Sequence, residues 1–202
     1  MAALSLSACS TPTSGNAQPS PTAVGTSSQT APNSPGGQAP GQGAPKVANP
    51  IDVTSYLQAP CNTLTGTQVS RLLGENAKSN ADLKATAGPT CTWKPPGNTN
   101  KQVVVNLFTT PPEGLSRIYR LHGTDLKFFM EVPPVEGHPA VAYGFTDTRN
   151  TKGECIVGVG TSDTSLLNTI ITLSDANIGK MDPCAIAQEV AGEALANIKG
   201  GR

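Results

Sequence analysis

The sequence is poor in charged and aromatic residues, and its two kinds of charge balance. Of its 202 residues, 14% are Asp, Glu, Lys or Arg and only 4% are Phe, Trp or Tyr. The 14 basic and 14 acidic side chains give a formal net charge of zero, without a basic block or an acidic tail. Nucleic acid is therefore not an expected partner, because proteins that bind it concentrate basic residues on one surface.

Long apolar runs and catalytic motifs are also missing. No run of about 18 apolar residues follows Cys9, so we expect no membrane-spanning helix. The chain has no Gly-x-Ser-x-Gly, His-Glu-x-x-His or Walker segment, and His122 and His138 stand apart. We therefore expect no catalytic residue, no metal and no cofactor. We expect His122 to interact with the last carbonyls of a helix, and His138 to lie on the surface of a turn.

Residues 10–50 contain almost nothing that could build a folded core. The segment has one charged residue, Lys46, and no aromatic, Leu or Ile residue. Such a composition cannot bury enough apolar surface to offset the entropy of ordering the chain. The sequence predicts a disordered Ser/Pro/Gly-rich tether over 10–50, roughly 35 Å from end to end, and a folded domain over 51–202.

The N-terminus has the pattern of a lipoprotein signal. Leu6-Ser7-Ala8-Cys9 is an apolar stretch that ends in small residues and a cysteine. We expect residues 1–9 to be the end of a signal peptide, with Cys9 carrying lipid that includes palmitate. The segment before Cys9 is short and has no basic residue, so we also expect the true start to lie upstream. Because two or more acyl chains anchor a protein durably, the expected location is the extracytoplasmic face of the cell membrane.

Four cysteines remain after Cys9, an even number that is typical of disulfides in an oxidising compartment. They are Cys61, Cys91, Cys155 and Cys184. No Cys-x-x-Cys spacing occurs, which argues against zinc. We prefer the pairing of sequence neighbours, Cys61 with Cys91 and Cys155 with Cys184. The alternative, Cys61 with Cys155 and Cys91 with Cys184, would also tie helix ends to strands.

Three helices are expected from caps and apolar spacing. The first begins at a capping box, Thr65-Gly66-Thr67-Gln68, and runs to about residue 74. The second follows a similar box at Thr110-Pro111-Pro112-Glu113 and ends near Gly123. The last begins after Asp182, which should cap it, and continues to about Ile198.

The strands predict an α+β fold. β-forming runs occur over 89–93, 102–108, 126–132, 137–145, 154–160 and 166–173. The segment 75–88 is polar and has no clear period. The predicted domain is an antiparallel sheet of about five to six strands with helices packed on one face, stabilised by two disulfides.

Two adjacent phenylalanines give the sharpest hint of a binding surface. Phe128 and Phe129 lie next to each other in an expected strand, so they should point to opposite faces of the sheet. One of them should belong to the core. The other should either lie under a helix or line a groove that accepts a lipid or a peptide. Phe128 and Phe129 are therefore the candidate ligand groove.

Several of these features occur together in one family. They are the cysteine signal at Cys9, the tether, Pro60-Cys61, Cys91-x-Trp93, Gly137-x-Pro139-Ala140 and Asp182-Pro183-Cys184. In combination they resemble the actinobacterial lipoproteins grouped as domain-of-unknown-function family 3558. The resemblance covers residues 51–202, and it implies an envelope-associated lipoprotein without assigned catalytic residues.

The expected function is that of a non-enzymatic, lipid-anchored module that binds an envelope partner or a small hydrophobic ligand. Two alternatives remain, a structural accessory subunit of an envelope complex and a cell-wall-modifying hydrolase. A ligand carrier should contain an apolar cavity, and an enzyme should contain a cleft with converging titratable groups. An accessory subunit should instead expose an apolar patch.

Overall fold

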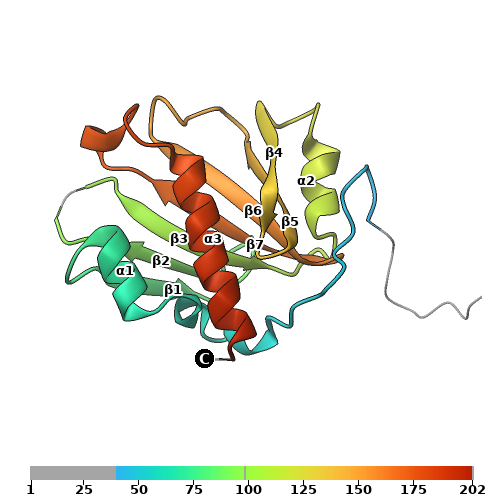
Figure 1. Cartoon of the computed structure of the whole chain (residues 1–202), viewed down its shortest axis with the longest axis horizontal. Helices are drawn as coiled ribbons and strands as arrows, with labels where there is room; N and C mark the ends of the chain where they lie inside the picture. The colour runs from blue at the N-terminus through green and yellow to red at the C-terminus, as the bar shows by residue number, and fades with distance from the viewer. Residues whose placement is uncertain (1–39, 98, 202) are drawn as a thin grey trace, which may run out of the picture. The chain divides into compact units, whose positions relative to one another are not determined.

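The computed structural model describes residues 40–97 and 99–201, in which a single antiparallel sheet is the central element (Figure 1). The described helices are α1 (Gly66–Leu73), α2 (Leu115–Leu121) and α3 (Pro183–Lys199), with short 3-10 turns η1 (Thr54–Tyr56), η2 (Pro60–Thr63) and η3 (Asp175–Asn177). The strands are β1 (Lys78–Asp82), β2 (Thr90–Lys94), β3 (Gln102–Phe108), β4 (Phe128–Val135), β5 (His138–Gly144), β6 (Glu154–Ser162) and β7 (Ser165–Thr172).

The seven strands follow the order β1-β2-β3-β7-β6-β5-β4, and every neighbouring pair is antiparallel. The predicted α+β class and antiparallel sheet are confirmed, with one strand more than expected. The additional strand is β1, which falls in the segment where the sequence shows no clear period. All five residues of β1 are exposed, so no apolar side chain marks one of its faces.

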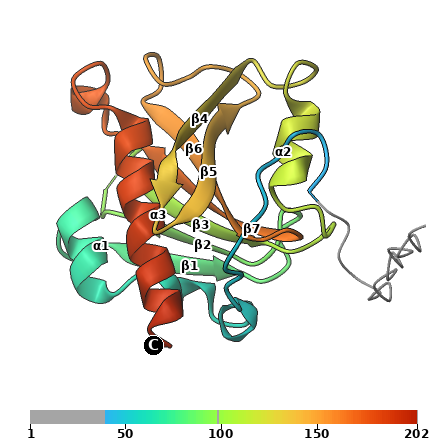
Figure 2. The ribbon, with the colours of Figure 1, turned by 45° about the vertical axis from the view of Figure 1, so that its right-hand side comes forward.

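The main core lies between the sheet and the helices α1 and α3 (Figure 2). Alternate strand residues point to it because side chains along a strand alternate between the two faces. From α3 the core receives the small or branched residues Ala187, Val190, Ala191, Ala194 and Leu195. The strands contribute residues such as Val105, Val157 and Leu167. The apolar spacing that predicted the last helix therefore corresponds to the face that α3 buries.

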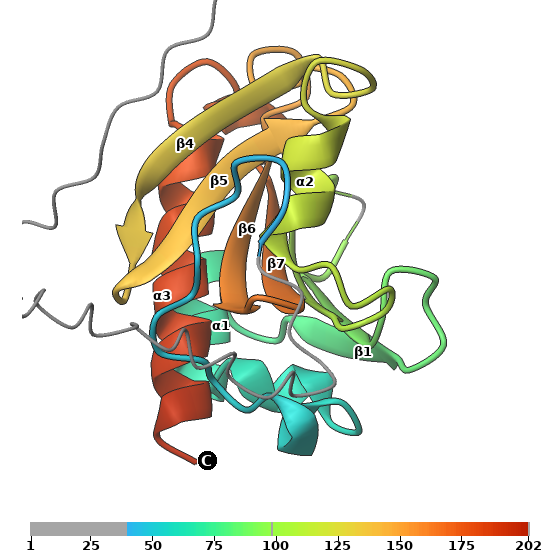
Figure 3. The same cartoon turned by 90° about the vertical axis from the view of Figure 1, so that its right-hand side faces the viewer.

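The helix α2 packs on the other face of the sheet (Figure 3). Its Leu115 and Ile118 join a second cluster with Val141, Tyr143 and Leu166. The described helices thus cover both faces, whereas the sequence predicted one. The reason is that Val141 and Tyr143 occupy the alternate positions of β5, which gives this strand an apolar side chain on each face.

Two of the three predicted helix starts are confirmed. In α1, the Thr65 hydroxyl accepts from the Gln68 N–H and the Gln68 side chain accepts from the Thr65 N–H, which completes the capping box. In α3, the Asp182 carboxylate accepts from the Cys184 N–H at 2.8 Å. The capping box expected for the second helix is wrong. The helix α2 begins after Gly114, whose φ of 51° favours glycine and which provides no side-chain cap.

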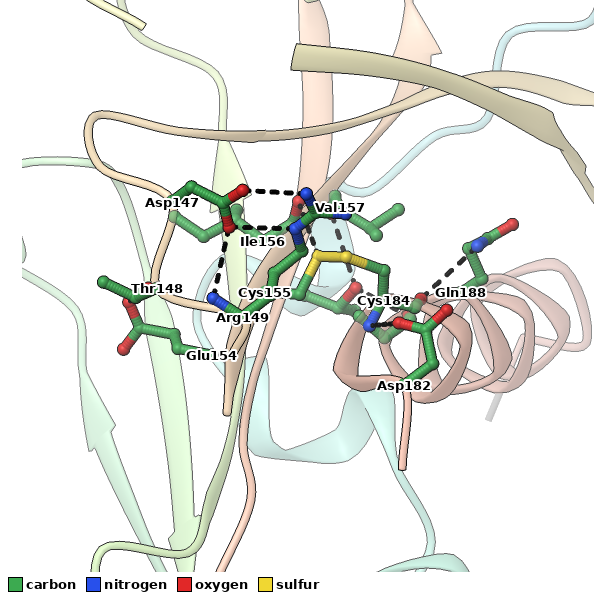
Figure 4. The surroundings of a disulfide bond; sticks show 12 residues. Asp147, Thr148, Arg149, Glu154, Cys155, Ile156, Val157, Asp182, Cys184 and Gln188 are labelled. Carbon is green, nitrogen blue, oxygen red and sulfur yellow. Dashed lines mark hydrogen bonds and ion pairs between the residues drawn. A yellow bond between two sulfur atoms is a disulfide. The ribbon is translucent and has the colours of Figure 1, made fainter. Parts of the chain in front are cut away.

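The preferred disulfide pairing is confirmed. Cys61 in η2 bonds to Cys91 in β2, and Cys155 in β6 bonds to Cys184 in the first turn of α3. The Cα atoms of the two pairs are 5.0 and 5.1 Å apart, within the usual range for disulfides. Figure 4 shows the second bridge, which attaches α3 to the sheet where this helix begins.

Residues 40–51, which we call the strap, pass beside α2 and cross the sheet (Figure 3). Ala44 joins the α2 cluster, whereas Ile51 packs against the main core. Val47 is buried and its N–H donates to the Asp163 carboxylate at 2.8 Å, while the Ile51 N–H donates to the Thr161 carbonyl at 2.8 Å. The described domain thus starts at least ten residues before the expected boundary at 51. The predicted signal segment, Cys9 and tether residues 10–39 lie outside the described residues.

Candidate functional site

The two phenylalanines of the candidate groove have different surroundings. Phe129 lies under α2, where its ring stacks on His122 with centroids 4.0 Å apart and meets the Tyr119 ring edge-on at 5.1 Å. Phe128 points to the opposite face, is buried, and lines a cavity near the end of β5. The side chain of His122 therefore packs on an aromatic ring. Of the two predicted groove residues, only Phe128 lies in the wall of this cavity.

The cavity forms where β5 and β6 separate from each other. Their last paired residues are Tyr143 and Ile156, and residues 145–153 connect the two strands beyond that point. We call the resulting space, of about 400 Å³, the loop cavity. Its wall includes Phe128, Tyr143, Phe145, Ile156, Lys152 and Glu154. This volume lies within the range of small-ligand sites, which is roughly 300–1,000 Å³.

An aromatic side chain stands exposed at the mouth of the loop cavity. Phe145 follows directly after β5 and is 59% exposed, more than any other large apolar side chain of the described residues. The preceding Gly144 lets the chain turn there, because a Cβ atom would lie 2.8 Å from the Thr146 carbonyl oxygen. Phe145 is thus held where a ligand could cover it.

The floor of the cavity is rigid and uncharged. The Tyr143 hydroxyl donates to the side-chain oxygen of Asn168 at 3.0 Å, and both residues are buried. Burial raises the pKa of Tyr143, so the phenol stays protonated at neutral pH. A buried and fully formed hydrogen bond of this kind fixes the orientation of the ring.

The loop above the cavity is braced by a charged pair (Figure 4). Arg149 donates from two nitrogens to the Asp147 carboxylate, at 2.9 and 2.8 Å, and its guanidinium lies 3.8 Å from the centre of the Phe128 ring. Hydrogen bonds from Arg149 hold the pKa of Asp147 below its usual value. Because this ion pair is partly exposed, its net contribution to stability is small, and its main effect is to orient the loop.

The wall of the loop cavity carries few charged groups. Lys152 and Glu154 are the two residues of opposite charge in the wall of the loop cavity, and the other wall residues are neutral. Within residues 40–97 and 99–201, no three His, Cys, Asp or Glu side chains come together as a metal site. The described helices also include none that is long and apolar enough to cross a bilayer.

The surface position expected for His138 is wrong. Its side chain is only 3% exposed and lies at the start of β5, outside the loop cavity. A histidine between Gly137 and Pro139 is typical of a turn, but here the turn ends at Gly137 and His138 is already part of the sheet.

Sequence reasoning missed Phe145, the residue that stands out most in the structure. The alternation of β5 marked residues 137–145 as one strand, and in such a strand Phe145 would be buried on the same face as Tyr143. The strand instead ends at Gly144. The glycine at 144 followed by polar residues from 146 onward was the available signal for an early strand end.

Comparison with known families decides the relationship of the chain. The sequence profile of the family described as "Protein of unknown function (DUF3558)" matches residues 4–197. The chain belongs to the DUF3558 family. No curated protein and no solved structure matches it.

Proposed function

We propose that this DUF3558 protein is a non-enzymatic binding module that holds a small apolar ligand, or an apolar group of an envelope partner, in the loop cavity. The observation that carries the proposal is the exposed ring of Phe145 beside a cavity whose wall joins Phe128, Tyr143 and Ile156 to the polar residues of the 145–153 loop and the start of β6. Aromatic side chains that stand in water next to a concave wall with both apolar and polar groups are typical of binding sites.

The contribution of Phe145 to the binding free energy can be estimated from the apolar area that a ligand would cover. Covering about 80–100 Å² of the Phe145 ring would contribute about 2 kcal/mol to binding. The brace between Arg149 and Asp147 supports the proposal as well, because a loop that is already ordered loses little entropy when a ligand binds.

We further propose that the module acts outside the cytoplasmic membrane, anchored through lipid on Cys9. The sequence around Cys9 and the two disulfides support this location, since disulfides persist in oxidising compartments. About 30 residues separate Cys9 from the strap. The loop cavity would then work close to the membrane surface.

The substitution Phe145→Ser tests the proposed site. We expect it to weaken binding of the neutral fluorescent probe N-phenylnaphthylamine about 30-fold, because about 2 kcal/mol of apolar burial is lost. Fluorescence titration of the purified domain measures this change. Phe145 is exposed, so the substitution should leave the free energy of unfolding nearly unchanged.

The matched control is Leu83→Ser. Leu83 is also a large apolar residue, 45% exposed, but it follows β1 at the other edge of the sheet. This variant should bind the probe as the original protein does. Equal binding by the Phe145 variant and the original protein, with both folded, would contradict the assignment of the loop cavity.

A further inference from the structure

A second concave site is lined by residues of α1 and α3, two helices that lie on the same face of the sheet (Figure 1). It has a volume of about 280 Å³ and is lined by parts of α1, β3, β7 and α3, so we call it the helix groove. Its lining shares no residue with that of the loop cavity. The two sites are therefore separate, and the argument for one does not depend on the other.

Apolar residues form much of the helix groove, and the uncharged polar residues Gln102, Thr172 and Asn177 also line it. Val103 and Ile171 form a cross-strand pair between β3 and β7, and Leu173 follows on the same face. Leu72 of α1 and Ile186 of α3, both half-buried, form the two sides. The exposed Met181, at 47%, lies at the rim. A flexible thioether at the edge of an apolar groove can adapt to the shape of a ligand.

One cation at the rim is already neutralised. The Arg71 guanidinium lies 2.8 Å from the Glu189 carboxylate and also pairs with Glu193. These three side chains together carry a charge of −1. Arg71 is therefore not a free partner for an anion, and this end of the groove disfavours a second negative group.

The other cation at the rim is unpaired. Lys101 directly precedes β3 and is two residues from Val103, which places it on the same face as the groove floor. The ion pairs found among residues 40–97 and 99–201 do not include Lys101. The lining of the groove thus combines apolar residues with the unpaired Lys101 and with Arg71, whose charge Glu189 and Glu193 outweigh.

We propose that the helix groove binds a single-chain monocarboxylate, a fatty acid of medium length, with its tail on the apolar floor and its carboxylate at Lys101. The charge distribution selects this occupant, since a carboxylate complements Lys101 and an uncharged tail end avoids the Arg71–Glu189–Glu193 cluster. The small volume favours one short chain over a lipid with several chains, because about 280 Å³ is just below the usual range for ligand sites of roughly 300–1,000 Å³.

The first test compares octanoate, octanol and octylamine in nuclear magnetic resonance titrations of the isotope-labelled protein. Octanoate should shift the resonances of Val103, Leu173 and Ile186. Octanol should bind about tenfold more weakly, and octylamine more weakly still, because Lys101 attracts only the anion. Between hexanoate and octanoate, affinity should rise about fourfold for each added methylene.

The second test reverses the charge at the rim. Lys101→Glu should weaken octanoate binding at least tenfold while leaving octanol binding unchanged. Lys84→Glu is the matched control, since Lys84 is an exposed lysine in the segment after β1 and outside the groove lining, and the overall charge change is the same. This control should bind octanoate as the original protein does.

Three results would overturn the proposal. The first is that octanoate does not bind below its micelle concentration. The second is that the Lys101 and Lys84 variants bind octanoate equally well. The third is that octanoate shifts resonances around Phe145 and not those of the groove residues. The last result would support the loop cavity as the site for apolar ligands. If Phe145→Ser loses naphthylamine binding, octanoate should still shift the resonances of the helix groove in this variant.

Discussion

At the scale of single residues, His138 has the most unusual environment. Its side chain is buried, and its Nδ1 atom has no hydrogen-bond partner among the described residues. Desolvation is the largest cause that lowers the pKa of His138 below 6.5, and the positive charge of Lys199 lowers it further. A hydrogen bond to the Gly160 backbone and the charge of Glu136 act in the opposite direction but do not outweigh burial.

This environment predicts a pH dependence of stability. The folded pKa of His138 is lower than the unfolded value, so the unfolded chain takes up a proton first as the pH falls. The contribution of His138 to the free energy of unfolding should therefore be complete well above pH 6.5 and should decrease as the pH falls through this value towards the lower folded pKa. Urea titrations across this range measure the effect.

The control for this prediction is His138→Gln, which keeps a polar side chain of similar length but does not titrate. The variant should lose stability at neutral pH and show a flatter dependence in the same range. His122→Gln provides the comparison at the exposed histidine. If the His138 variant kept the full decrease, another group would have to cause it.

At the scale of elements, the strap extends the folded unit. Val47 and Leu115 both lie against Gly160, where an added Cβ atom would be 2.8 Å from a Val47 methyl group. The missing side chain at 160 thus makes room for Val47. The strap is held by backbone donors and two small apolar residues, Ala44 and Val47. From composition alone the strap is predicted to be disordered. Backbone donors do not change the hydrophobicity of a segment, and two small apolar residues raise it only slightly.

The strap predicts a protease-resistant site. Lys46 is exposed, but the next residue, Val47, is buried and hydrogen-bonded to Asp163. Trypsin should therefore cut after Lys46 much more slowly than after Lys84 in the exposed segment that follows β1.

Val47→Asp should release the strap, because a buried carboxylate is costly, and should raise the rate of cleavage after Lys46 at least tenfold. Mass spectrometry of the fragments measures both rates. Rapid cleavage after Lys46 in the original protein would mean that the strap is not docked.

The two disulfides are also features of this scale, and each should contribute a similar stability. They close loops of nearly equal length, with sequence separations of 30 and 29 residues. In the chain-entropy description, removing one bridge lowers the free energy of unfolding by about 3.5 kcal/mol. Replacing Cys61 and Cys91 by serine, and separately Cys155 and Cys184, allows the two losses to be compared by urea denaturation. A loss below about 1 kcal/mol for either pair would contradict this account.

At the scale of the whole molecule, the central question is where the protein resides. We expect Cys9→Ser to abolish incorporation of labelled palmitate and to release the protein from the membrane fraction, because the proposed anchor consists of acyl chains on Cys9. Metabolic labelling followed by fractionation measures both. Cys61→Ser is the control, since it should leave labelling unchanged. Palmitate incorporation that persists in the Cys9 variant would show that the lipid is attached elsewhere.

Much of the fold could be predicted because local patterns determine it. The caps at Thr65 and Asp182, the alternation of six strands and the positions of the disulfide cysteines are all readable along the chain. Strand β1 could not be found in this way, since all its side chains face solvent and it is held by backbone bonds to β2. The docking of the strap could not be found either, because its partners Asp163 and Thr161 lie far away in the sequence.

The candidate sites were less predictable than the fold. Phe128 and Phe129 were correctly expected on opposite faces, but only the structure shows that Phe129 lies under α2 and that Phe128 reaches the loop cavity. Phe145 became notable only because β5 ends one residue before it. Lys101 gave no signal in the sequence, because an isolated lysine before a strand is usually a solvated residue.

The sequence by itself determined the family, the α+β class and the residues that form helices, most strands and disulfides. These properties depend on caps, periodicity and composition, which act over a few neighbouring residues. Only the tertiary structure decided which distant residues share a cavity, as with Lys101 and Ile186 in the helix groove. It also decided that the strap joins the domain and that His138 is buried. Such contacts arise when strands and helices pack together, because packing joins surfaces from segments that lie far apart along the chain.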